Sequence, residues 1–241
     1  MRFMIMHKMT DEMEKGLPPD PEIIEGVGQL IESGVEGGAF LSGEGLKPSS
    51  QRLRLAYEGG RRTVTPGPFS DPHELVAGYA LLRVGSRDEA IAWCDKYAAA
   101  VGDLELTLGP VVEPWDIGMG ERPDDPPQRF LALHQMDERA EREVPPTPAE
   151  MAKMSALIEE MTSAGVLEAT GGLTSTKRGA RVHFEGATHR VIDGPFAESK
   201  ELIAGYAIME LPSKAAAIEW AVRFGHVVRV HEVEIREVAE G

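Results

Sequence analysis

The chain has 241 residues, and 40 aspartate and glutamate residues outnumber 25 lysine and arginine residues, which gives a formal charge of −15. A surface this acidic repels phosphate backbones and anionic lipids, so the composition argues against a nucleic-acid or membrane-surface role. The single cysteine, Cys94, cannot form an internal disulfide and falls in a helical pattern typical of a buried, inert thiol. Because the sequence shows neither a secretory leader nor an apolar run of ~20 residues, we expect a cytoplasmic protein.

An internal repeat dominates the sequence. Residues 2–111 align without a gap with residues 129–238, each 127 positions further along, and about 30 of roughly 110 positions are identical. The stretch between the copies is rich in proline and glycine, which disfavour a helix or a central strand. The sequence therefore predicts a first repeat over residues 1–111, a linker over 112–127 and a second repeat over 128–241.

Each repeat opens with a strand and a helix. Residues 2–8 and 129–135 are apolar on both alternations, which predicts a strand in the middle of a sheet. Asp20 and Thr147 stand at N-cap positions, each followed by a proline, and Thr147 forms a capping box with Glu150. We expect glycines to end the two helices, at positions 34, 37 and 38 in the first and at 165 in the second.

The rest of each repeat predicts further strands and a second helix. In the first copy we expect short strands near 39–45, 52–58 and 63–65, and a longer one over 76–84. A helix follows from Ser86, with Glu89 completing a capping box, and alternation over 104–108 indicates a last strand. This order, repeated in each copy, is close to the ferredoxin-like split βαβ arrangement, an α+β fold. The bare face of each sheet needs a cover, which the other copy can supply, as in a homodimer.

The second copy contains a recognisable motif. The stretch Val191 to Glu201, which includes Asp193-Gly194-Pro195-Phe196, resembles the signature of the YCII-related, DGPF-type family. The helices around Trp93 and Trp220 fit the same pattern, so the resemblance covers both repeats. It implies a dimeric α+β barrel, formed here within one chain by two ferredoxin-like repeats. In the first copy Pro66 stands at the aspartate position, so we expect the two copies to have diverged in function.

The resemblance also implies a site. Relatives are thought to hold a histidine and an aspartate in a cleft, some accompany sigma factors, and one acts on a chlorinated hydroxyquinol-type substrate. The matching residues here are His134 and Asp193, with His7 at the position equivalent to His134. A histidine near neutrality can act as a general acid or base, but a buried structural histidine explains the pattern as well. Asp193 before Gly-Pro is also typical of an Asx turn.

Four recurring residues are candidates for substrate binding: Arg54, Arg181, Tyr79 and Tyr206. The arginines can bind a carboxylate, although a cross-strand ion pair is the alternative, and the tyrosines are also typical of a core. The extra histidines of the second copy, at positions 183, 189, 226 and 231, lack a tight ligand spacing, so we expect no metal. Nucleotide-binding and serine-hydrolase motifs are not found.

The function predicted from the sequence is a small-molecule enzyme without a cofactor, a lyase or isomerase. It would carry out elimination, isomerisation or cyclisation by acid–base chemistry of His134, Asp193 and His7 in a cleft between the repeats. The alternative is a non-catalytic ligand-binding or regulatory module, associated with transcription. The partners expected are a small-molecule ligand and, as an alternative to a monomer, a second copy of the fused chain, with no nucleic acid or membrane.

Overall fold

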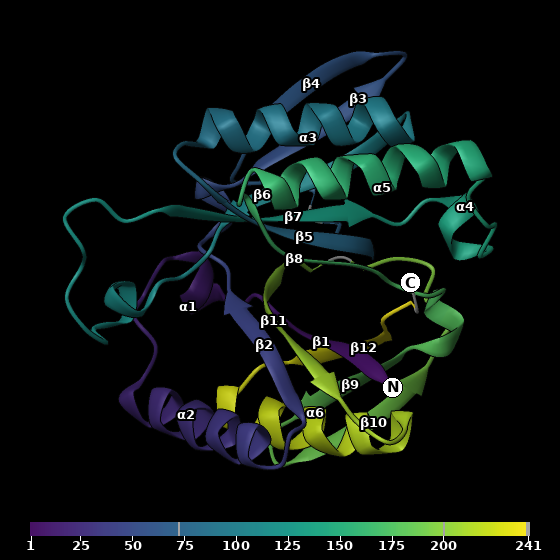
Figure 1. Cartoon of the computed structure of the whole chain (residues 1–241). Coiled ribbons are helices and arrows are strands. Elements are labelled where there is room, and N and C mark those ends of the chain that lie inside the picture. Colours follow the sequence, from purple (N-terminus) through teal and green to yellow (C-terminus); the bar gives the residue numbers. More distant parts are fainter. Residues whose placement is uncertain (72, 200, 240–241) are drawn as a thin grey trace. The chain divides into compact units, whose positions relative to one another are not determined.

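The computed structural model describes residues 1–71, 73–199 and 201–239, and it divides into two compact units (Figure 1). The first unit comprises Met1–Pro48, Asp71–Glu74 and Leu173–Gly241, and the second comprises Ser49–Ser70 and Leu75–Gly172. Each unit contains one six-stranded sheet in which neighbouring strands pair antiparallel.

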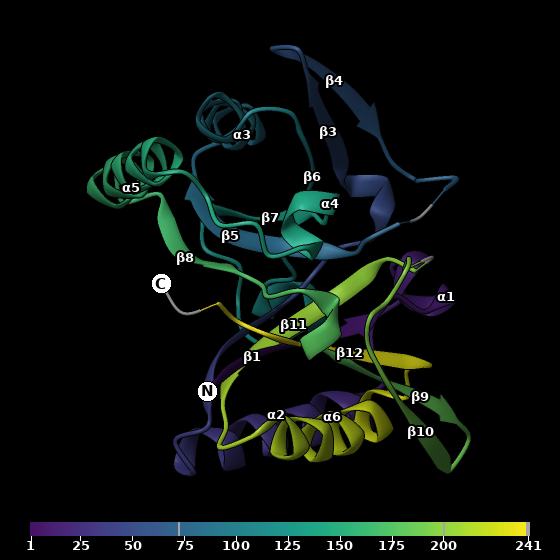
Figure 2. The same cartoon turned by 90° about the vertical axis from the view of Figure 1, so that its right-hand side faces the viewer.

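The sheet of the first unit has the order β10-β9-β12-β1-β11-β2. Helices α2 and α6 lie side by side on one face of it (Figure 2). Its elements are β1 (Arg2–Lys8), α1 (Asp11–Glu14), α2 (Pro21–Glu36), β2 (Phe40–Gly45), η3 (Thr176–Arg178), β9 (Ala180–Glu185), β10 (Thr188–Asp193), β11 (Ile203–Glu210), α6 (Lys214–Val228) and β12 (Glu232–Glu237).

The sheet of the second unit has the order β4-β3-β6-β7-β5-β8, and α3 and α5 cover one of its faces. Its elements are η1 (Ser49–Gln51), β3 (Leu53–Glu58), β4 (Arg61–Pro66), β5 (Val76–Val84), α3 (Arg87–Val101), β6 (Leu104–Pro110), η2 (Pro114–Ile117), β7 (Gln128–Gln135), α4 (Glu138–Glu141), α5 (Pro148–Ser163) and β8 (Leu167–Gly172). Every strand and helix of the first repeat has its counterpart in the second, so the predicted α+β fold with two ferredoxin-like repeats is confirmed.

Each unit is built from parts of both repeats. In the first unit, β1, α2 and β2 come from the first repeat, whereas β9 to β12 and α6 come from the second. The four strands β12-β1-β11-β2 have the order of a ferredoxin-like sheet, and the hairpin β9–β10 extends it. The second unit has the reciprocal composition. The sequence predicts the element order of each repeat, but not that the two repeats share each sheet, because strands of either copy satisfy the same hydrophobic pattern.

The predicted central strand and helix starts are confirmed. Phe3, Met4, Ile5 and Met6 are each at most 1% exposed, and β1 lies between β11 and β12. The side chains of Asp20, Ser86 and Thr147 accept hydrogen bonds from backbone N–H groups of the first helical turn, and Thr147 forms the expected capping box with Glu150.

Two local expectations are wrong. Gly37 and Gly38 end α2 as expected, but Gly34 lies inside the helix, where a Cβ atom would lie 2.9 Å from Cβ of Phe40. Glu89 does not complete a capping box with Ser86, since its carboxylate accepts a hydrogen bond from the backbone N–H of Gly85 at 2.8 Å. The sequence also did not predict the short helices α1 and α4. None of the helices within the described residues is long and apolar enough to cross a membrane.

Candidate functional site

His134 lies on the face of its sheet that the helices cover. On β7 it follows the same alternation as Phe130 and Ala132, which both pack into the core of the second unit. The phenol oxygen of Tyr97, on α3, lies 2.9 Å from His134 Nδ1. The two rings meet edge to face with centroids 5.6 Å apart. Strand alternation and helix packing thus bring together two polar side chains that are 37 residues apart.

A cavity of about 310 Å³ lies beside this pair, lined by residues of β5 to β8 and of helices α3 and α5. This volume is at the lower end of the range of about 300–1,000 Å³ that is typical of small-molecule sites. The wall is mainly apolar, and its polar side chains include those of His134, Tyr97 and Thr170. The apolar part of the wall includes Trp93, Ala132, Met154, Leu157, Met161 and Leu167.

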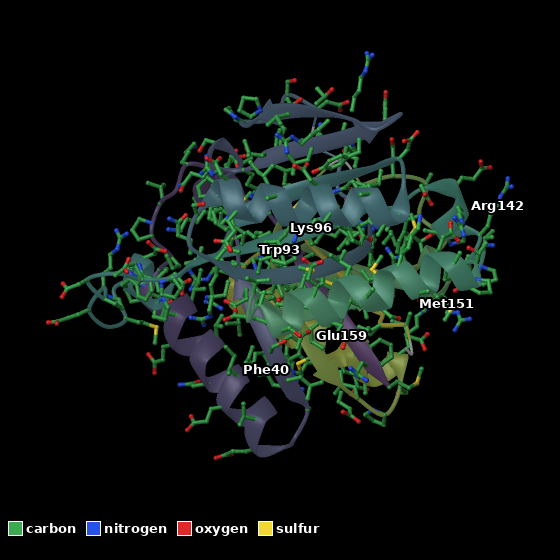
Figure 3. The ribbon with its side chains drawn as sticks, turned by 45° about the horizontal axis from the view of Figure 1, so that its top comes forward. Phe40, Trp93, Lys96, Arg142, Met151 and Glu159 are labelled. Carbon is green, nitrogen blue, oxygen red and sulfur yellow. The ribbon has the colours of Figure 1, made fainter. Side chains whose placement is uncertain are left out.

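An ion pair joins α3 and α5, the two helices that line the cavity. Figure 3 shows Trp93 and Lys96 together on α3, and the Lys96 ammonium lies 3.9 Å from the centroid of the Trp93 ring. The same ammonium lies 2.7 Å from a carboxylate oxygen of Glu160 on α5. The ion pair connects the two helices that line the cavity, whereas the cation–π contact lies within α3.

Burial keeps both members of the polar pair neutral. It lowers the pKa of His134, and the nearby charge of Asp137 opposes this only in part. Burial also raises the pKa of Tyr97 to about 12. Near neutral pH the pair is therefore a neutral imidazole bonded to a neutral phenol. One of the two side chains donates the hydrogen bond and the other accepts it. Whichever donates, the pair keeps one further donor and one further acceptor for a ligand.

The first unit contains the counterpart of this pair without the hydroxyl. His7 stands at the position of His134, and Phe224 on α6 stands at the position of Tyr97. The rings of His7 and Phe224 meet edge to face at 5.4 Å between centroids. A phenyl ring can neither donate nor accept a proton, so the two copies differ in the chemistry of this position.

The sequence model of the YCII-related domain matches residues 1–104 and again residues 129–240. The chain belongs to the YCII-related family. A comparison with curated proteins found no match. The family resemblance inferred from the sequence, with two tandem copies, is confirmed.

In this YCII-related chain the DGPF motif packs tightly against η3. A Cβ atom on Gly194 would lie 1.8 Å from the carbonyl oxygen of Thr176, so only glycine fits. The backbone N–H of Phe196 donates to Thr176 Oγ1 at 2.9 Å, and its ring lies 4.2 Å below the guanidinium of Arg181. The motif therefore positions the Phe196 ring beneath the charged Arg181 side chain of β9.

Asp193 lies at the end of β10 in the first unit, whereas His134 belongs to the second. The Asp193 carboxylate is 74% exposed and lies 2.6 Å from Lys214 Nζ at the start of α6. The structure gives Asp193 no bond to a histidine among the described residues, and its nearest charged partner is this lysine. A catalytic role of Asp193 stays a prediction.

The arginines singled out in the sequence form the cross-strand ion pairs considered as an alternative. Arg54 lies 3.5 Å from Glu105, and its guanidinium covers the Phe69 ring at 4.6 Å, as Arg181 covers Phe196. Tyr79 and Tyr206 are 8% and 5% exposed. In its strand each alternates with residues that pack under the helices, so each tyrosine side chain points to the other face of its sheet. Whether these four residues bind a substrate stays a prediction.

A buried ionic cluster on β12 was not predicted from the sequence. Glu234 is 1% exposed, and its carboxylate lies 3.4 Å from Lys8, 2.9 Å from Arg181 and 3.3 Å from Arg236. Glu232 is also buried and lies 3.0 Å from His183 Nε2. Burial would raise the pKa of Glu234, but the positive charges of Lys8, Arg181 and Arg236 overcome this effect and lower it.

Signals for the missed residues were present in the comparison of the repeats. Tyr97 reads as one more apolar position of α3, but its counterpart is Phe224, which isolates the hydroxyl as the difference. Glu234 aligns with Thr107, and Arg236 aligns with Gly109. A charge present in one copy and absent from the other indicates a contact specific to that copy.

Proposed function

We propose that the protein is a small-molecule enzyme that transfers a proton with His134 and Tyr97 in the cavity of the second unit, without an organic cofactor. The observation that carries the proposal is the hydrogen bond between Tyr97 and His134 in the wall of an otherwise apolar cavity. The pair keeps one donor and one acceptor beyond its own hydrogen bond, and a ligand in the cavity can engage them. The reaction class that fits is an elimination, isomerisation or cyclisation.

The neutral state of the pair suits this chemistry. Because burial lowers its pKa, the His134 imidazole is unprotonated near neutral pH and can accept a proton from a weakly acidic substrate group. Tyr97 stays protonated and can donate to an oxygen on which negative charge develops, or return the proton. A mainly apolar wall favours a neutral substrate over a charged one, because a charged group would lose its hydration without compensation.

The test uses ligand binding and solvent exchange together. A thermal-shift screen with neutral carbonyl and hydroxyl compounds identifies binders, since a ligand at 100 times its Kd adds about 2.7 kcal/mol to the free energy of unfolding. Each binder is then incubated in D2O, and NMR detects deuterium that replaces a C–H proton. We expect exchange with the native protein, and losses of at least tenfold with His134→Gln and with Tyr97→Phe.

The first unit provides the matched control. His7→Gln changes the equivalent histidine in the copy that lacks the hydroxyl, so we expect binding and exchange to continue at the native rate. Equal losses with His7→Gln and His134→Gln, or exchange that is unaffected by Tyr97→Phe, would rule out the proposed site.

The alternative is a ligand-binding module, including a regulatory one, that performs no chemistry. One observation favours it: within the described chain, Tyr97 is the hydrogen-bond partner of His134, and no carboxylate orients the imidazole as in many catalytic triads. Under this alternative, the variants weaken binding and no ligand exchanges deuterium.

A further inference from the structure

The two units differ in how side chains fill the space between the sheet and the first long helix of the repeat, which is α2 in the first unit and α5 in the second. Around the cavity of the second unit stand Ala132 on β7 and Leu167 on β8. Their counterparts in the first unit are Ile5 on β1 and Phe40 on β2, and both are larger. Other positions of the wall change in the opposite direction: Met161 and Thr170 become Gly34 and Gly43.

The Phe40 side chain lies against both glycines. A Cβ atom on Gly34 would lie 2.9 Å from Cβ of Phe40, which is closer than real contacts allow. A Cβ atom on Gly43 would lie 3.2 Å from Cζ, at the opposite end of the same side chain. The Phe40 side chain therefore packs between Gly34 of α2 and Gly43 of β2, where neither neighbour adds a side chain of its own. The larger residue at position 40 thus stands beside the two positions that are smaller than in the second unit.

The surrounding side chains in the first unit are packed together. Ile5 is 1% exposed and belongs to the core, against which Phe40 and Phe224 pack. The rings of Phe224 and Trp220 are stacked, with centroids 5.2 Å apart and planes 16° from parallel. In the second unit the equivalent Tyr97 instead turns its hydroxyl to His134.

We infer that Phe40 and Ile5 fill in the first unit the space that Leu167 and Ala132 leave open in the second, so that one chain binds one ligand at its second unit. Leu167 and Ala132 are then specificity-determining residues, because their size sets the volume of the cavity. The inference rests on the proposed function in one respect only, namely that this cavity is where the ligand binds. The number of sites and the residues that set it follow from packing alone.

The probe for the test is 1-fluoronaphthalene, observed by 19F NMR. It has no hydrogen-bonding hydrogen, and its two fused rings suit a cavity about twice the ~150 Å³ that holds benzene in an apolar protein core. We expect the native chain to bind one probe molecule. The variant Ala132→Ile with Leu167→Phe introduces the side chains of the first unit, and we expect it to bind at least tenfold more weakly.

The reciprocal variant, Ile5→Ala with Phe40→Leu, should raise the number of bound probes from one to two. Each single substitution is measured beside the doubles, and near-UV circular dichroism identifies any variant that has lost its tertiary packing. Two probes on the native chain, or native affinity in the folded Ala132→Ile variant, would overturn the inference. If the native chain binds one probe but exchanges no deuterium into any ligand, the proposed chemistry is refuted and the inference is not.

Discussion

Replacing Glu234 with glutamine should destabilise the first unit strongly, and the pH dependence of the effect should identify its cause. The carboxylate lies 3.4 Å or less from three cationic side chains, those of Lys8, Arg181 and Arg236. The Glu234→Gln substitution keeps the shape of the side chain but removes the negative charge that the three cationic side chains share, and Glu232 remains beside Lys8 and Arg181. Breaking a buried ion pair on one side typically costs about 3–5 kcal/mol, and we expect a loss in this range at pH 7.

The sign of the pH dependence follows from the lowered pKa of Glu234. A carboxyl group whose pKa is lower in the folded state contributes stability above its unfolded pKa, about 4.5, and loses it as the pH falls through the folded value. The glutamine variant lacks this titration. The difference in stability between the native protein and Glu234→Gln should therefore be largest at pH 7 and become smaller below about pH 4.5.

Urea unfolding followed by circular dichroism at pH 7 and at pH 4 measures both quantities. The matched control is Thr107→Val in the second unit, where Thr107 occupies the equivalent position and accepts a 3.2 Å hydrogen bond from Gln135. Loss of this neutral bond should cost about 1 kcal/mol and should not depend on pH. A loss below about 1 kcal/mol with Glu234→Gln, or a difference that stays constant down to pH 4, would refute the account of a buried charge cluster.

Three further predictions concern single positions. Gly194→Ala should destabilise the protein by about 1–3 kcal/mol in urea unfolding, because the new Cβ atom would meet the Thr176 carbonyl oxygen. Gly28→Ala, at an open position of a helix, should be neutral or stabilising. Asp193→Asn should change the unfolding free energy by less than about 1 kcal/mol, since its ion pair is exposed; a larger loss would show a structural role. Burial lowers the pKa of His134 in the folded state, so as the pH falls the histidine of the unfolded state is protonated before that of the folded state. The free energy of unfolding should therefore decrease below about pH 6.5, and it should decrease less in His134→Gln.

Local features were predictable because their causes lie within a few residues. The N-caps at Asp20, Ser86 and Thr147 depend on side chains that bond backbone N–H groups of the next turn. The central position of β1 follows from a strand that is apolar on both faces, and the facing of His134 towards the helices follows from alternation. The N-cap of the first long helix and the central position of the first strand were correct in both copies.

The parts that were missed depend on residues far apart in the chain. Strands β5 and β6 of the first repeat satisfy the same hydrophobic pattern as β11 and β12 of the second. The sequence could therefore not tell which of these pairs would flank β1. Glu232, Glu234 and Arg236 alternate with apolar residues on β12, a pattern typical of a solvent-facing side. Only the three-dimensional arrangement shows that they are buried. The Tyr97–His134 pair likewise depends on the packing of α3 against β7.

The interleaving of the repeats has a consequence for the order in which the protein can form during synthesis. The second unit is complete once residue 172 has left the ribosome, whereas β1 pairs with β11 and β12, which end at residues 210 and 237. At a translation rate of about 5–20 residues per second, β1 waits on the order of ten seconds or more for its partners. During that time a strand with apolar side chains on both faces is without its sheet. Strand β1 is made before the other strands of its sheet and is fully paired only after β12, so the growing chain presents an apolar strand that a chaperone can bind.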